Sequence, residues 1–136
     1  MKKILGIDYG ERRIGIAISD SLKIIASPLL VLDRKKKYNY LDDIKNLIIE
    51  HDIGLIVVGL PLTLKGTISI QTEKTQDFIK ELDLIVDVPI KTIDERLTSL
   101  EAEKILIQKG IKTGHNKSQI DQVSAIIILQ EYLDTN

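Results

Sequence analysis

The chain has 136 residues, 43% of them hydrophobic and 29% charged, which fits one globular domain over residues 1–136. A formal net charge of −1 argues against a protein that coats nucleic acid through bulk positive charge. The absence of cysteine excludes disulfides and thiolate metal sites, and two histidines are too few for a zinc cluster, so any metal would need oxygen ligands.

The first part of the chain predicts a meander of three strands. Residues 2–9 and 13–19 are rich in isoleucine, and the Gly-Glu-Arg turn between them predicts a hairpin. Residues 24–32 add a third strand, in which Pro28 indicates an edge strand or a bulge. The basic run Arg34–Lys37 is more typical of a solvated loop before a helix than of a nucleic-acid patch.

The remainder of the chain alternates helices with short strands. Apolar residues recur at helical spacing around residues 41–48 and over residues 70–85, which predicts helices. The short runs LIVVGL and PIKTID predict strands. A Thr-Ser-Leu-Glu capping-box pattern starts one of the helices. In chain order, the predicted elements are a helix around residues 41–48, a strand over 55–60, a helix over 70–85, a strand over 89–94 and two helices over 98–110 and 118–133.

This order predicts an α/β domain with one mixed five-stranded sheet. The antiparallel meander continues into right-handed parallel crossovers, and helices flank the sheet. In open sheets of this kind, ligands bind beyond the carboxyl ends of the parallel strands. Acidic residues at those ends are therefore the first candidates for a functional site.

Acidic residues at three places are predicted to converge at that edge. Asp8 closes the first strand, and Asp94 and Glu95 close the fifth. Because side chains alternate along a strand, only one of Asp94 and Glu95 should point at Asp8, and spacing does not say which. Asp121 lies in the first turn of the last helix and shares an inward stripe with Ala125. Carboxylates placed together repel unless a cation holds them, which favours Mg²⁺ or Mn²⁺.

Each acid also has a purely structural interpretation. Asp121 follows Ser118 by three residues, where an acid commonly caps a helix. Asp94 could hydrogen-bond the loop that follows it, and Arg96 could pair with a neighbouring acid. Asp8 is harder to explain in this way, because an unpaired carboxylate buried in an apolar interior costs several kcal/mol.

Small residues and cations near the same edge fit a phosphate-bearing ligand. Gly10 permits a tight turn beside the first strand. Gly15 and Ala17 leave one face of the second strand nearly bare, either for a polymer backbone or for a packed helix. The loop after the fourth strand carries Lys65 and Thr67, which are candidate phosphate donors.

Four stretches, which together span nearly the whole chain, resemble the signature blocks of the YqgF (RuvX-like) family: GIDYGERRIGIAISD, GLPLTLKGT, DERLTS and KSQIDQVSAIIILQEYL. That family is similar to RuvC-type resolvases, so the resemblance implies an RNase H-like fold. Its members are described either as Holliday junction resolvases or as nucleases that mature the 5′ end of pre-16S rRNA. Two positions depart from the family pattern: Thr63 stands where asparagine is common, and Gln122 where a small or apolar residue is common.

The resemblance implies an acidic active site at Asp8, Glu95 and Asp121, with Asp94 as a further candidate ligand. These carboxylates would bind two Mg²⁺ or Mn²⁺ ions, with Asp8 bridging both, and a phosphodiester bond would be hydrolysed without a covalent intermediate. The implied enzyme is a hydrolase acting on ester bonds. The residues predicted to contact the substrate are Arg96, Lys65, Thr67, Gly10 and Gly15.

Processing of structured RNA is favoured over resolution of branched DNA. Cutting opposed strands of a junction needs a two-fold dimer, but the chain has no tryptophan and one phenylalanine, so interface anchors are scarce and a monomer is favoured. A ribosomal assembly is a further expected partner, because it could present the RNA. A non-catalytic RNA-binding or ribosome-assembly factor is the main alternative, whereas an actin-like ATPase would need two such domains.

No segment has the features of a signal peptide, and no apolar run is long enough to span a membrane. A soluble protein of the cytoplasm without membrane contact is the expectation that follows.

Overall fold

The computed structural model describes residues 2–36, 39–63, 65–95 and 117–135, with the side chains of the last helix described from residue 122 onward. The helix predicted over 98–110 and the side chains of Arg96 and Asp121 lie outside these residues. Within the described ranges, no helix is both long and apolar enough to cross a membrane.

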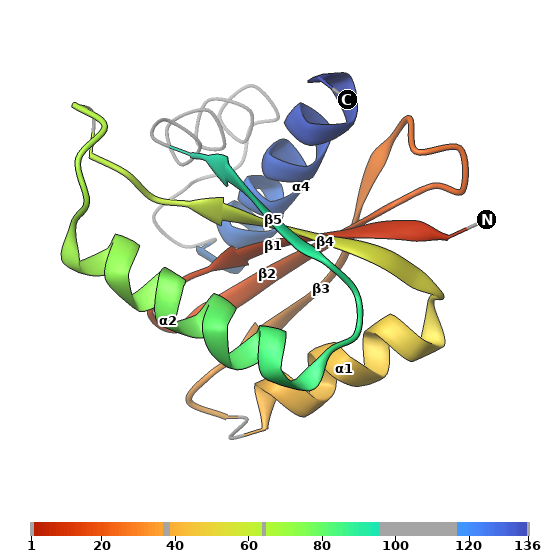
Figure 1. Cartoon of the computed structure of the whole chain (residues 1–136), viewed down its shortest axis with the longest axis horizontal. Helices are drawn as coiled ribbons and strands as arrows, with labels where there is room; N and C mark the ends of the chain where they lie inside the picture. Colours follow the sequence, from red (N-terminus) through yellow and green to blue (C-terminus); the bar gives the residue numbers. More distant parts are fainter. Residues whose placement is uncertain (1, 37–38, 64, 96–116, 136) are drawn as a thin grey trace.

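Five strands form one mixed sheet (Figure 1): β1 (Lys3–Tyr9), β2 (Arg13–Ser19), β3 (Ala26–Asp33), β4 (Ile53–Leu60) and β5 (Ile90–Asp94). Their order across the sheet is β3-β2-β1-β4-β5. β2 pairs antiparallel with both β1 and β3, whereas β4 runs parallel to β1 and β5 runs parallel to β4. The predicted meander with parallel crossovers is therefore confirmed.

β3 begins two residues later than predicted, and a side chain explains the difference. The carboxylate of Asp20 accepts the backbone N–H groups of Ile24 and Ile25 at 2.8 and 2.9 Å, so these residues complete a loop instead of pairing along the strand. Pro28 lies on this edge strand, opposite a register shift between Ile16 and Ala17. Both expectations for the proline hold, because proline has no N–H to donate to a ladder.

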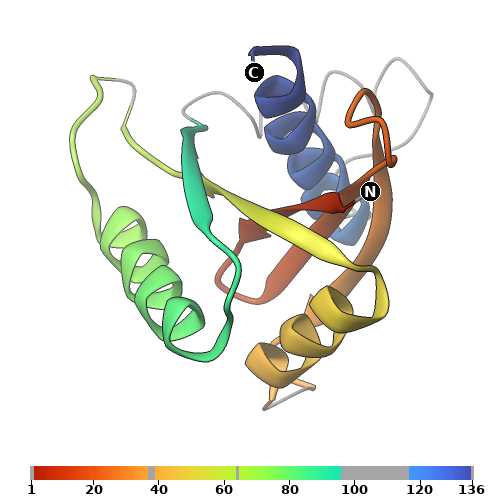
Figure 2. The ribbon, with the colours of Figure 1, turned by 45° about the vertical axis from the view of Figure 1, so that its right-hand side comes forward.

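Three helices are described, α1 (Tyr40–Glu50), α2 (Ile70–Ile85) and α4 (Lys117–Thr135). α1 and α2 cover one face of the sheet and α4 covers the other (Figures 1 and 2). α2 begins with a capping box, in which Thr72 N–H donates to Ser69 Oγ at 3.2 Å and Ser69 N–H donates to Thr72 Oγ1 at 3.0 Å. α4 starts one residue before the predicted start, so Asp121 lies past the first turn and not within it.

Alternation along β1 separates two apolar cores. Leu5 and Ile7 are fully buried beneath α1 and α2 with Phe78. Ile4 packs on the opposite face with α4. Gly6 also lies on that face, and a Cβ there would be 2.7 Å from Leu129 Cβ, so only glycine lets α4 lie this close to the sheet.

The small residues of β2 lie beneath the same helix. Ala17 is fully buried in the core that α4 covers. Of the two predicted reasons for a small residue here, a packed helix and not a polymer backbone is the one that the structure shows at Ala17. Gly15 is buried as well and lies opposite Asp8 across the β1–β2 pairing. The side of the sheet that contains Asp8 is therefore shaped by the close approach of α4.

Candidate active site

Asp8 lies near the carboxyl end of β1, on the face that α4 covers. Asp8 is on the same face of β1 as Ile4 and Gly6, because side chains alternate along a strand, and both of those residues contact α4. The residue is partly buried. The carboxylate of Asp8 therefore lies where the sheet meets the amino-terminal part of α4.

Glu95 lies directly after β5 and points to the same face. Its backbone N–H donates to Leu60 O at 3.1 Å and so continues the parallel pairing one residue past the strand. A Cβ added at Gly59 would be 2.8 Å from Glu95 Cδ and Oε2 and would overlap the side chain of Ile128 in α4. The Glu95 carboxyl group therefore lies over Gly59, in space that only a glycine leaves open.

The carboxyl groups of Asp8 and Glu95 are in contact. The pKa of Glu95 is raised to about 9, first by burial, then by the negative charge of Asp8 and a hydrogen bond between the two groups, with a smaller contribution from Asp94. Asp94 is exposed, and alternation directs it away from the face of Glu95. Of the two acids at the end of β5, Glu95 is thus the one that reaches Asp8.

The backbone position of Asp121 falls on the stripe of α4 that faces the sheet. Ser124, Ala125 and Ile128 of this stripe are buried, with at most 2% of their surface exposed. α4 runs antiparallel to β1, because Leu133 lies near Ile4 whereas Ala125 lies over Gly6. Asp121 is about one helical turn, or ~5 Å, beyond Ala125 toward the end of β1 that carries Asp8.

The donor set fits a hard divalent cation. Two carboxyl groups in contact repel when both are ionised, so either a proton or a cation must lie between them. Oxygen donors of this kind suit Mg²⁺ or Mn²⁺. Among the described side chains no cluster of three or more ligand residues occurs, and the third predicted ligand, Asp121, is outside them.

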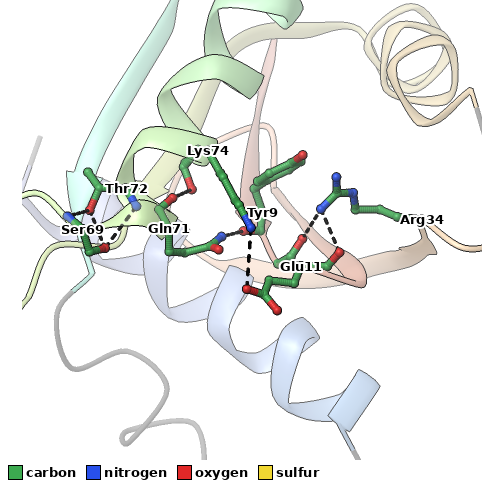
Figure 3. Close-up of polar contacts among 9 residues, drawn as sticks. Tyr9, Glu11, Arg34, Ser69, Gln71, Thr72 and Lys74 are labelled. Carbon is green, nitrogen blue, oxygen red and sulfur yellow. Dashed lines mark hydrogen bonds and ion pairs between the residues drawn. The ribbon is translucent and has the colours of Figure 1, made fainter.

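The turn that follows Asp8 is held from two sides (Figure 3). Gln71 of α2 donates from Nε2 to Tyr9 O at 3.2 Å, and Lys74 of the same helix pairs with the Glu11 carboxylate at 4.0 Å. Arg34 donates from Nη1 to the carbonyl oxygens of Gly10 and Glu11 at 2.9 and 2.8 Å. These bonds fix the chain immediately after the candidate acid.

Arg34 corrects one expectation. We predicted that the run Arg34–Lys37 would be a solvated loop, but Arg34 is only partly exposed and its guanidinium lies 4.6 Å from the ring centroid of Tyr9. Tyr9 in turn stacks on Phe78, with 4.2 Å between ring centroids. A guanidinium over an aromatic face is attracted by the ring, so Arg34 packs as part of the fold.

Gly10 makes the tight turn that was predicted for it. Its N–H donates to Arg13 O at 2.9 Å, and a Cβ at residue 10 would lie only 2.6 Å from that oxygen. No larger residue fits without moving the backbone of the hairpin.

The loop after β4 is closed by two threonines. Thr63 and Thr67 share a hydroxyl–hydroxyl hydrogen bond of 2.5 Å, and Thr67 N–H donates to Thr63 Oγ1 at 3.1 Å. Gly66 has φ 80°, a left-handed conformation that glycine adopts without strain. Lys65 is exposed beside this turn. Contacts from Lys65 and Thr67 to a phosphate stay predictions, as do those from Arg96.

A sequence model of the family described as "RuvX: Holliday junction resolvase" matches residues 2–135. The chain belongs to the RuvX family. A relative from Halothermothrix orenii, named "Putative pre-16S rRNA nuclease", is 44% identical over 132 residues, which cover 97% of this chain and 94% of that protein. A relative from Chloroflexus aggregans with the same name is 45% identical over 131 residues, covering 96% and 92% of the two chains.

Two solved structures show that the RuvX chain has the fold of RuvC-like resolvases, which is RNase H-like as expected. The Fowlpox virus resolvase, solved with Holliday junction DNA, superposes with a TM-score of 0.61 at 13% identity and covers 98% of this chain and 97% of its own. RuvC of T. thermophilus, also solved with a junction substrate, gives a TM-score of 0.58 at 12% identity, with 99% and 95% covered.

Three residues around the RuvX acid pair were not predicted as parts of the site. Gly59 leaves open the space that Glu95 occupies. The only feature of the sequence that could have indicated this role is that a glycine stands just before the end of the predicted strand. Arg34 and Gln71 fix the turn after Asp8 through carbonyl oxygens, and carbonyl partners leave no trace in a side-chain pattern. All three act on the position of an acid.

Proposed function

We propose that this RuvX protein is a metal-dependent nuclease that hydrolyses phosphodiester bonds at the Asp8–Glu95 pair, and that it processes the 5′ end of precursor 16S rRNA. The observation that carries the proposal is the contact between these two carboxyl groups at the carboxyl edge of the parallel strands. The RNA substrate is supported by the names of the two relatives, each covered over more than nine-tenths of its length.

The proposed cation ligands are Asp8, Glu95 and Asp121, on β1, after β5 and on α4. Two Mg²⁺ or Mn²⁺ ions, when bound, would supply the positive charge that stabilises the attacking and leaving oxygens of the phosphodiester. The chain's own contribution is placement. Gly59 leaves room for Glu95, and the hydrogen bonds from Arg34 and Gln71 keep the end of β1 in register.

The proposed substrate contacts lie around this centre. Lys65 is on the loop after β4, and Arg96 follows Glu95 directly in sequence, so either cation would be near a phosphate bound at the acid pair. We propose that Gly10, Gly15 and Thr67 also lie close to the sugar–phosphate backbone of the bound nucleic acid. Replacing a single phosphate-contacting cation should weaken binding about equally for all sequences.

Resolution of Holliday junctions is the second candidate function. It is favoured by the description of the family and by the fold that this chain shares with two resolvases whose structures contain Holliday junction DNA. The two candidates need the same chemistry, because either substrate is cut at a phosphodiester bond. They differ in geometry, since a resolvase needs two sites related by a two-fold axis.

A cleavage assay separates these functions. The purified protein is incubated with Mg²⁺ or Mn²⁺ and either an RNA fragment carrying the precursor 5′ end or a mobile four-way DNA junction. We expect cleavage of the RNA, a loss of about 10³-fold in Glu95→Gln, and nearly unchanged cleavage in the matched control Asp94→Asn, which removes the same charge one residue away.

Two outcomes would contradict the proposal. Symmetric nicks in the junction with intact RNA would assign the protein to resolution. Equal rates in Glu95→Gln and the original protein would remove the acid pair from the chemistry. If neither substrate were cut with either metal, the alternative of a non-catalytic RNA-binding or ribosome-assembly factor would replace a nuclease.

A further inference from the structure

A groove lined by lysines lies at the opposite end of α4 from Asp121. It has a volume of about 370 Å³ and lies between the amino-terminal ends of β1 and β4, the loop between β2 and β3, and the last turns of α4. We call it the basic groove. Its lining residues are Lys2, Lys3, Ile4, Lys23, Gly54, Leu55, Tyr132 and Leu133.

The positive charge of the basic groove is not neutralised by the residues that the structure describes. Lys2, Lys3 and Lys23 form no ion pair with any of them. Lys91 of β5 lies beside Tyr132, a lining residue of the groove, with its Nζ 5.8 Å from the centroid of that ring, and it also lacks such a pair. Several unpaired cations around one groove attract a polyanion.

Two carboxylates of the surrounding elements are engaged elsewhere. Asp20 accepts the N–H groups of Ile24 and Ile25, which lowers its pKa and keeps it ionised within its own loop. Asp134 accepts a hydrogen bond from Gln130 Nε2 at 3.0 Å. Both acids serve local hydrogen bonds.

The loop that carries Lys23 is fixed against α4. Gln130 accepts the N–H of Ala26 and donates to Ile24 O, both at 2.9 Å, so one side chain clamps the loop from two sides. Lys23 itself has φ 61°, an uncommon conformation for a residue other than glycine, and its N–H donates to Asp20 O. The lysine is therefore presented by a built loop, which lowers the entropy cost of binding.

Lys2 is placed by a glycine. The pairing of β1 with β4 shifts register next to Gly54, where a side chain would come within 2.8 Å of Lys2 Cβ and 2.9 Å of Lys2 Cδ. The stem of Lys2 thus lies over the strand, and the residue lines the groove.

The basic groove and the acid pair lie on the same face of the sheet. Lys91 and Glu95 share the alternation of β5 on the side of α4, and the two positions are four residues apart, or about 13 Å along the strand. A stacked nucleic-acid strand advances ~3.4 Å per nucleotide, so this distance corresponds to about four nucleotides.

We infer that the basic groove binds the sugar–phosphate backbone of single-stranded RNA that flanks the cleavage site by a few nucleotides. Lys2, Lys23 and Lys91 contact successive phosphates, and Tyr132 offers a ring to a sugar or a base. This inference rests on the proposed nuclease function for the location of the scissile phosphate. The binding it describes can be measured without cleavage.

The test uses the intact protein carrying Asp8→Asn, so that no probe is cut. The groove variant adds Lys2→Gln, Lys23→Gln and Lys91→Gln, and the matched control adds Lys36→Gln, Lys45→Gln and Lys80→Gln, three exposed lysines around the other face. The probes are labelled single-stranded RNAs of about four and about twelve nucleotides, sized on the distance above. Affinity is measured over a range of salt concentrations.

We expect the groove variant to lose about tenfold or more in affinity for the longer RNA, and its salt slope to fall by about two, at ~0.7 per phosphate contact. The short RNA and the control variant should change little. A set of Lys→Arg replacements at the same three positions should keep the longer RNA bound, which separates charge from a folding defect. Equal affinities of groove and control variants, or equal losses for both RNAs, would overturn the inference.

The outcome is independent of the proposed function. If the original protein cuts RNA but the groove variant binds RNA as tightly as the control variant does, the basic groove is not a binding surface and the nuclease proposal stands. If the groove lysines govern RNA binding but no nucleic acid is ever cut, the groove assignment stands and the nuclease proposal falls.

Discussion

The two faces of the sheet are built from the same strands, and each packs an apolar core against helices, but they differ in the size and charge of the side chains that the strands present. Beneath α1 and α2, large side chains such as Ile7, Ile16 and Phe78 are fully or nearly fully buried in one apolar core. Beneath α4, the strands present Gly6, Ala17 and a pair of carboxyl groups. Alternation along a strand thus places large apolar side chains on one face and small residues with the carboxyl pair on the other.

In this small domain, the apolar core on one face offsets the cost of burying carboxyl groups on the other. Small residues on the strands let α4 and the carboxyl groups lie close to the sheet, but small residues bury less apolar surface than large ones. The opposite core supplies that area with large, well-packed side chains. Neighbouring residues of one strand, Ile7 and Asp8, therefore belong to different functions, and substitutions at each should separate them.

The largest effect is expected for Asp8→Asn. Cleavage should fall by about 10³-fold or more, because a cation ligand is lost. At a pH above the pKa of Glu95, the metal-free protein should be as stable as the original or more so, because repulsion between the ionised carboxylates of Asp8 and Glu95 is removed. Cleavage assays and thermal melting in a chelator check the two parts. A melting temperature lowered by several degrees would identify Asp8 as a structural acid and contradict the account.

Ile7→Ala should produce the opposite result. Ile7 is fully buried, so the substitution should lower the free energy of unfolding by about 2–5 kcal/mol. The folded fraction should keep nearly normal cleavage, since the side chain points away from the acids. Urea unfolding and cleavage at low temperature provide the measurement. Loss of activity beyond the loss of folded protein would show that the two faces are coupled.

Gly59→Ala should damage both properties moderately. The new methyl group must displace the Glu95 carboxyl or Ile128, so we expect a loss of about 1–3 kcal/mol in stability and up to about 10²-fold in cleavage. Gly6→Ala is the matched control, because its methyl group meets Leu129 and no acid. Stability should fall in both variants, but cleavage much less in Gly6→Ala; equal cleavage losses would argue against placement of Glu95 by Gly59.

A further effect is a slope of stability with pH. The pKa of Glu95 is raised from 4.5 to about 9 in the folded protein, so protonation favours the folded state. Without metal, this stabilisation should be complete below the pKa of the unfolded chain and be lost as pH rises toward 9. Urea midpoints between these limits should decline in the original protein and in Asp94→Asn but not in Glu95→Gln. A decline of the same size in Glu95→Gln would assign the slope to other groups.

The fold could largely be predicted because its signals are local. The helical period over residues 70–85 and the isoleucine-rich strand over 13–19 match α2 and β2 at both ends. The later start of β3 depended on Asp20, whose side chain takes two backbone N–H groups that the strand pattern assigned to the sheet. A side chain can compete with a ladder in this way, and apolar periodicity does not register it.

The convergence of Asp8 with an acid at the end of β5 could be predicted from the sequence, but which of the two acids takes part could not. Whether Asp94 or Glu95 reaches Asp8 depends on the bond from Glu95 N–H to Leu60 O, which is set by how β5 pairs with β4. Arg34 was misjudged for a similar reason, since the carbonyl oxygens it binds are 23 and 24 residues earlier in the chain. Such long-range contacts follow from tertiary packing.

Titration of Mn²⁺ into the metal-free protein by calorimetry tests the central claim most directly, namely that the carboxyl pair on the α4 face is a cation site. We expect binding to the original protein and to Asp94→Asn, and loss of binding in Glu95→Gln although that variant stays folded. The same Mn²⁺ affinity in all three proteins, or no binding to the original, would contradict it.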